Sequence, residues 1–108
     1  MYVLVDLDAT PPAVTLEEPD DCKRFHVHAM GARDPAVLAS ALDGVVIGWL
    51  AGDHAFIRTD AVRAMAGGRV GEGWADGFDR MLDYARGKGW LDDAGDAIQA
   101  HVEWDAPA

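Results

Sequence analysis

The segment RFHVHAM, residues 24–30, decides the fold that this sequence predicts. Its side chains alternate along the chain with the two-residue period of a half-buried β-strand. His26 and His28 therefore share one face of the strand, while Val27 and Ala29 share the other face. We expect the apolar face to meet the protein core and the histidine face to remain open.

A second alternating segment, IQAHVEW at residues 98–104, repeats this pattern near the C-terminus. Its alternation places His101 and Glu103 together on one face of a strand. If this strand lies beside the strand of residues 24–30, three imidazoles and one carboxylate meet on a single surface. The candidate functional site therefore depends on whether the two strands are neighbours.

The chain between these two strands predicts three helices and a hairpin. Asp34-Pro35 is typical of a helix start and Gly44 of a helix end, so residues 34–44 form the first helix. Two β-rich runs within residues 45–58 flank a Gly-Asp turn and predict a hairpin. Helices over residues 59–66 and 72–87 follow, the second with one apolar stripe.

These elements predict an α+β fold. Over residues 24–104 their order is the βαββαβ pattern of a ferredoxin-like split βαβ domain. In that topology the first and last strands are antiparallel neighbours, and the helices cover one face of the sheet. The alternative is a winged helix-turn-helix, which would use the three helices and a C-terminal wing.

The whole chain, residues 1–108, reads as a single domain. Residues 2–8 and 13–16 have strand-like patterns separated by a Thr-Pro-Pro turn. We expect residues 1–23 to form an extra N-terminal strand, hairpin or arm beside the α+β core of residues 24–104.

Composition and charge narrow the function classes. The chain has 108 residues, of which 50% are hydrophobic, and a formal net charge of -10. An acidic surface repels phosphate backbones, so nucleic acids and anionic membranes are not expected partners. No apolar run approaches the roughly 20 residues of a membrane span. We expect a cytoplasmic protein whose partners are cations or a basic protein.

The histidine-bearing strands suggest a metal site. Imidazole nitrogen and carboxylate oxygen together bind Zn²⁺ and other divalent transition metals. The expected ligands are His26, His28, His101 and Glu103. The alternative is that these are ordinary polar residues on a half-exposed sheet face or at a dimer contact.

The open face of the sheet is the second candidate site. Its expected binding residues are His26, His28, His54, Trp49 and Trp104. Bare sheet faces that carry apolar side chains are usually covered, so we expect a homodimer or another partner on this face.

No catalytic motif stands out. Ser40 is the only serine, so a Gly-x-Ser-x-Gly nucleophile is absent. Cys22 is the only cysteine; Lys23 and Arg24 would lower its pKa, while Asp20 and Asp21 would raise it. The sequence favours a non-enzymatic binding or regulatory domain. A small dimeric enzyme or sensor with a histidine-rich site, and an acidic inhibitor or immunity-type protein, remain open alternatives.

Overall fold

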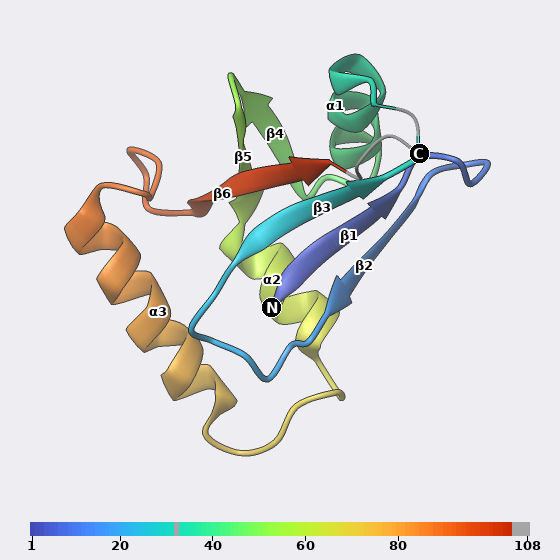
Figure 1. Ribbon diagram of the computed structural model, residues 1–108. Coiled ribbons are helices and arrows are strands. Elements are labelled where there is room, and N and C mark those ends of the chain that lie inside the picture. The colour runs from blue at the N-terminus through green and yellow to red at the C-terminus, as the bar shows by residue number, and fades with distance from the viewer. Residues whose placement is uncertain (32, 105–108) are drawn as a thin grey trace.

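One mixed β-sheet forms the centre of the molecule in the computed structural model, which describes residues 1–31 and 33–104. The sheet has six strands in the order β2-β1-β3-β6-β5-β4 (Figure 1). The strands are β1 (Tyr2–Asp6), β2 (Ala13–Glu17), β3 (His26–Met30), β4 (Gly48–Ala51), β5 (His54–Arg58) and β6 (Ala97–Trp104). With the three helices described below, the protein is a small α+β domain.

The strand directions divide the sheet into a parallel centre and two antiparallel edges. β1, β3 and β6 run parallel to one another. β2 pairs antiparallel with β1, and β5 pairs antiparallel with both β6 and β4. β1 and β2 thus form a hairpin within the sheet. A hairpin is one of the arrangements expected for residues 1–23.

The predicted neighbourhood of the two histidine-bearing strands is confirmed, but their predicted direction is wrong. β3 and β6 pair in parallel, with His26 opposite His101. β6 also lies between β3 and β5, whereas the ferredoxin-like order would place β3 between β6 and β5. The six-stranded sheet likewise differs from the small wing of a winged helix-turn-helix.

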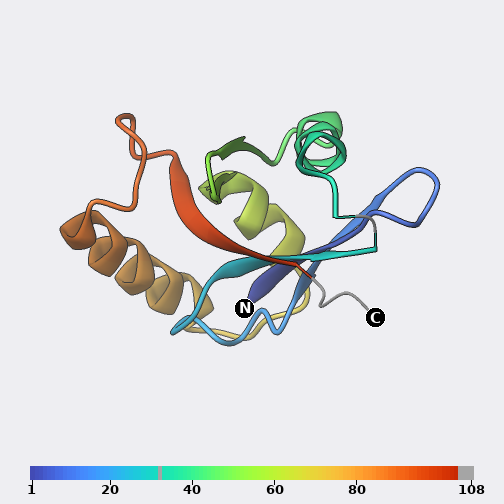
Figure 2. The ribbon, with the colours of Figure 1, turned by 45° about the horizontal axis from the view of Figure 1, so that its top comes forward.

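Two helices cover one face of the sheet. α1 (Pro35–Gly44) and α2 (Thr59–Ala66) both lie on the same side of the strands (Figure 2). The carboxylate of Asp34 caps α1 by accepting a hydrogen bond from the backbone N–H of Ala36 at 3.0 Å, as its position before proline predicts. The opposite face of the sheet, called the open face below, has no helix packed over it in the described chain.

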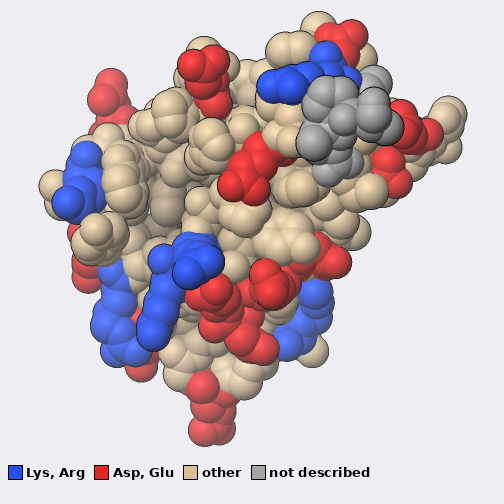
Figure 3. Space-filling view, viewed as in Figure 1, with Lys and Arg blue, Asp and Glu red and all other residues tan. Residues whose placement is uncertain are grey.

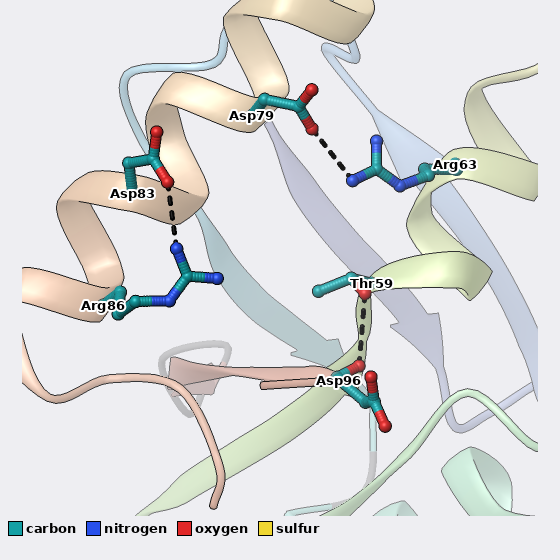
Figure 4. Close-up of polar contacts among 6 residues, drawn as sticks. All are labelled: Thr59, Arg63, Asp79, Asp83, Arg86 and Asp96. Carbon is teal, nitrogen blue, oxygen red and sulfur yellow. Dashed lines mark hydrogen bonds and ion pairs between the residues drawn. The ribbon is translucent and has the colours of Figure 1, made fainter. Parts of the chain in front are cut away.

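α3 (Trp74–Lys88) runs past the end of the sheet at which β3 and β6 begin (Figure 1). The indole N–H of Trp74 donates to the carbonyl oxygen of Pro19 at 2.6 Å. The guanidinium of Arg63 in α2 contacts the carboxylate of Asp79 at 3.0 Å (Figure 4). These contacts fix α3 both to the β2–β3 connection and to α2.

Thr59 is the first residue of α2 and does not cap this helix. Arg58 precedes α2 as the capping residue and makes no side-chain capping bond. The Thr59 hydroxyl instead donates to the carbonyl oxygen of Asp96 at 3.2 Å (Figure 4). The start of α2 is thereby held against the turn that leads into β6.

The hairpin strand β4 begins at Gly48, three residues later than the expected start at residue 45. Val46 has a positive φ of 56°, which bends the chain away from α1. The backbone N–H groups of Val46 and Ile47 donate to carbonyls at the end of α1, at 3.0 and 3.1 Å. Residues 45–47 therefore finish the helix before the strand starts.

The core lies between the sheet, the two helices that cover it and the buried side of α3. Alternate strand residues and the inner sides of the helices fill it, as the alternating patterns predict. Fully buried members are Val3, Val5, Leu16, Val27, Leu38, Leu42, Ile57, Val62 and Phe78. Among the described residues, no helix combines the length and apolar character needed to cross a membrane.

Candidate functional site

All four histidines of the chain lie on the open face of the sheet. β3 contributes His26 and His28, and the register places His26 opposite His101, which in turn lies opposite His54. Their neighbours along each strand are buried against the helices, so the alternation leaves the histidines on the other side. Uncharged side chains occupy most of the middle of this face, with acidic groups scattered among them (Figure 3).

Three side chains form the tightest polar cluster on this face. Ligand atoms of His26, His28 and Glu103 all lie within 4.8 Å of one another. The Nε2 atom of His26 is 3.5 Å from a carboxylate oxygen of Glu103, and His28 lies opposite Glu103 in the register. The structure thus brings together three of the four expected metal ligands.

Tyr2 completes the cluster, although the sequence did not identify it. Its ring stacks on the imidazole of His26, with centroids 4.9 Å apart and an interplanar angle of 16°. It also lies 6.2 Å from the ring of His28. Stacking restricts the plane of the His26 ring, as groups behind a metal ligand commonly do. In the sequence, Tyr2 alternates with the apolar residue Val3, which indicates only that the two side chains point to opposite faces of a strand. This alternation does not reveal that β1 pairs with β3.

Burial lowers the pKa of the His26 imidazole below its ordinary value of 6.5. Glu103 acts in the opposite direction, while the amino terminus, His28 and His101 lower the pKa further. The neutral form of His26 is therefore favoured. Because a metal ion binds the neutral imidazole, a lowered pKa leaves the ligand atom available at neutral pH.

His101 belongs to a different group from the other expected ligands. Its ring meets the ring of His54 edge-on, with centroids 6.4 Å apart. The two rings border a cavity of about 220 Å³ that Phe25, Trp90 and Gln99 complete. His54 thus lies on the open face as expected. The ring of His101 contacts His54 and is not part of the cluster of His26, His28 and Glu103.

The two tryptophans expected on the open face lie on opposite sides of the sheet. Trp49, 40% exposed, stacks on Phe56 at 5.5 Å and shares the histidine side at the β4 edge. Trp104 lies opposite Ala29, which is buried under the helices. Trp104 was expected on the open face, but the register places it on the face that the helices cover. Trp104 directly follows Glu103, and successive side chains of a strand point to opposite faces.

Comparison of the chain with known protein families, with curated proteins and with solved structures finds no match.

Cys22 lies outside the open face, next to α3. Burial raises the pKa of its thiol above the ordinary value of 9.0, and Asp21 and Asp20 raise it further. The amino terminus and Arg80 act in the opposite direction without reversing the shift. Burial and the acidic neighbours thus outweigh the cationic groups that lower the pKa of Cys22.

The raised pKa predicts slow alkylation of Cys22. Only the thiolate reacts with iodoacetamide, so we expect the rate in the folded protein to reach its midpoint above pH 9.0. In urea the midpoint should fall toward the ordinary thiol value, and at pH 8 the unfolded chain should react faster. Rates measured from pH 7 to 10 by mass spectrometry test this. A folded-state midpoint below the unfolded one would contradict it.

Proposed function

We propose that this protein is a small binding domain that acts through the open face of its sheet, with a divalent transition-metal ion as ligand. The observation that carries the proposal is the convergence of His26, His28 and Glu103, whose ligand atoms lie within 4.8 Å of one another. Two imidazoles and one carboxylate are a ligand set that suits Zn²⁺.

One pair of ligand atoms is already near the separation that a bound ion requires, while the cluster as a whole spans up to 4.8 Å. Ligand atoms at zinc distances in a tetrahedral site stand about 3.3 Å apart, close to the 3.5 Å between His26 and Glu103. Glu103 is 51% exposed, so its side chain can rotate without disturbing the core. Both histidines project from a central strand whose backbone is paired on both sides.

The ligand count supports an accessible ion. Three protein ligands leave a fourth position of tetrahedral zinc for water or another molecule, unlike closed structural sites. That position would face away from the sheet, on the side without helices. A ligand-binding or sensing role follows from this arrangement, and Tyr2 would hold the His26 ring in the required plane.

Thermal unfolding with added metal tests the proposal. An ion that binds only the folded state at 100 times its Kd adds about 2.7 kcal/mol of stability. For a domain of this size that corresponds to a rise in Tm of about 10 °C or more. We expect Zn²⁺ to raise the Tm of the wild type and Mg²⁺ to leave it unchanged. The His26→Ala/His28→Ala double variant should not respond to Zn²⁺. An unchanged wild-type Tm in excess Zn²⁺, Ni²⁺ and Cu²⁺ would refute the metal site.

The rest of the open face supports a protein partner. Trp49 and Phe56 form an apolar stack at the β4 end of this face, and a formal net charge of -10 favours a basic partner over an acidic one. A second copy of this chain could cover the same apolar stack, but it would carry the same net charge of -10, so the charge favours a basic protein over a homodimer.

A further inference from the structure

A second cavity, remote from the histidines, lies between α3 and the chain that joins β2 to β3. Its volume is about 450 Å³, within the range of small-molecule sites. Its lining residues are Cys22, Lys23, Gly77, Arg80, Met81 and Tyr84. The four α3 residues are spaced i, i+3, i+4 and i+7, so they form one stripe along the helix.

The charge of this cavity is opposite to that of the protein. Lys23 and Arg80 are its only charged lining residues, and both are cationic, in a chain of formal net charge -10. Basic side chains gather over the middle of α3 and the adjoining connection (Figure 3). An anion would therefore find its electrostatic partners here rather than elsewhere on an acidic surface.

Two of the α3 carboxylates near Arg80 in the sequence already have partners. Asp79 contacts Arg63 and Asp83 contacts Arg86, each at 3.0 Å (Figure 4). Within residues 1–31 and 33–104, no carboxylate lies within ion-pair distance of the side chains of Arg80 or Lys23.

Asp21, one of the two acidic residues that precede Cys22 on the connecting chain, is also engaged. It accepts a hydrogen bond from the backbone N–H of Lys23 at 3.0 Å and lies 3.9 Å from the amino terminus. The two cationic side chains of the cavity are thus left to neutralise an external group.

The remaining walls are apolar or aromatic. Met81 and Tyr84 follow Arg80 on the stripe, and the sulfur of Cys22 lies across from Gly77. A Cβ atom built on Gly77 would come within 3.7 Å of that sulfur, so the absent side chain leaves room between α3 and Cys22. A ring would contact Met81 and Tyr84 while its charged substituent faces the two cations.

We propose that this cavity binds a small aromatic anion, a ring that carries a phosphate or carboxylate group. Lys23 and Arg80 bind the anionic group, and Met81 and Tyr84 contact the ring. This site is independent of the histidine cluster, so either can fail without the other.

Alkylation of Cys22 tests the proposal, because the only cysteine of the chain lines this cavity. Phenyl phosphate should slow the reaction with iodoacetamide in a saturable manner, and benzoate in a parallel series distinguishes a carboxylate from a phosphate ligand. Benzyl alcohol, which has the ring without the charge, should not protect. The absence of protection by both anions, or equal protection by benzyl alcohol, would overturn the proposal.

Charge variants identify the residues responsible. Lys23→Ala and Arg80→Ala should each raise the half-protecting concentration of the anion about tenfold, the effect of losing one charge-assisted hydrogen bond. Arg33→Ala removes the same charge from an exposed position outside the cavity. In this control variant the anion should protect Cys22 at the same concentration as in the wild type. Both cavity residues are exposed, so the variants should retain the wild-type Tm. Equal protection of the Lys23→Ala/Arg80→Ala double variant and the wild type would overturn the assignment.

Discussion

Replacing Glu103 with glutamine is expected to weaken Zn²⁺ binding at least about tenfold. Loss of a residue that only hydrogen-bonds to a metal ligand already costs about tenfold in affinity, and Glu103 is expected to be a ligand itself. Glu103 lies 3.5 Å from His26 and within the ligand cluster. Glutamine keeps the size of the side chain and removes its charge, so the fold should be unaffected. Competition with a chromophoric chelator at neutral pH measures the Kd.

His101→Ala is the matched control for that substitution. His101 lies on the same strand and face as Glu103 but outside the cluster, with its ring against His54. We expect its Zn²⁺ affinity to remain close to that of the wild type. A loss for His101→Ala as large as the loss for Glu103→Gln would move the metal to the row of His26, His101 and His54.

Phe78→Ala is expected to produce the largest loss of stability, about 3–5 kcal/mol. The Phe78 ring is fully buried, stacks on Trp74 at 4.9 Å and lies 4.8 Å from the guanidinium carbon of Arg63. Its removal leaves a cavity where α3 joins the rest of the domain. Since the total stability of a small domain is about 5–15 kcal/mol, much of it would be lost.

Urea unfolding measures this change as a shift in the midpoint at an unaltered slope. Tyr84→Ala, on the same helix, is the control: Tyr84 is 60% exposed, and its loss should change the free energy of unfolding by only about 0.5 kcal/mol. Similar midpoints for the two variants would contradict the role of Phe78 as the anchor of α3.

Local patterns predicted most of the elements, because strands and helices arise from periodicity and capping. The helix that Asp34 starts ends at the predicted Gly44, and the last strand spans Ala97–Trp104 as expected. Strand direction follows instead from the path of the chain between strands. The pattern around His26 and His28 is the same for a parallel and an antiparallel neighbour, so the sequence could not decide between them.

The candidate sites likewise depend partly on local patterns, which the sequence reveals, and partly on which elements pack together, which it does not. Alternation placed His26, His28 and Glu103 on one face, and the neighbouring of β3 and β6 brought them together. The stacking of Tyr2 on His26 depends on a third strand from the start of the chain, which no local pattern reveals. The cavity beside Cys22 depends on where α3 packs, so the sequence did not identify Arg80 as a candidate binding residue.

The position of β6 affects how the domain assembles. It is the last strand of the residues that the structure describes, yet it lies between β3 and β5 in the sheet. Without it, β2-β1-β3 and β5-β4 would be two separate ribbons, each with an unpaired edge. During synthesis these edges stay available for wrong pairing until residues 97–104 emerge, and contacts so distant in sequence close slowly. The histidine cluster, which needs Glu103, can form only at that final step.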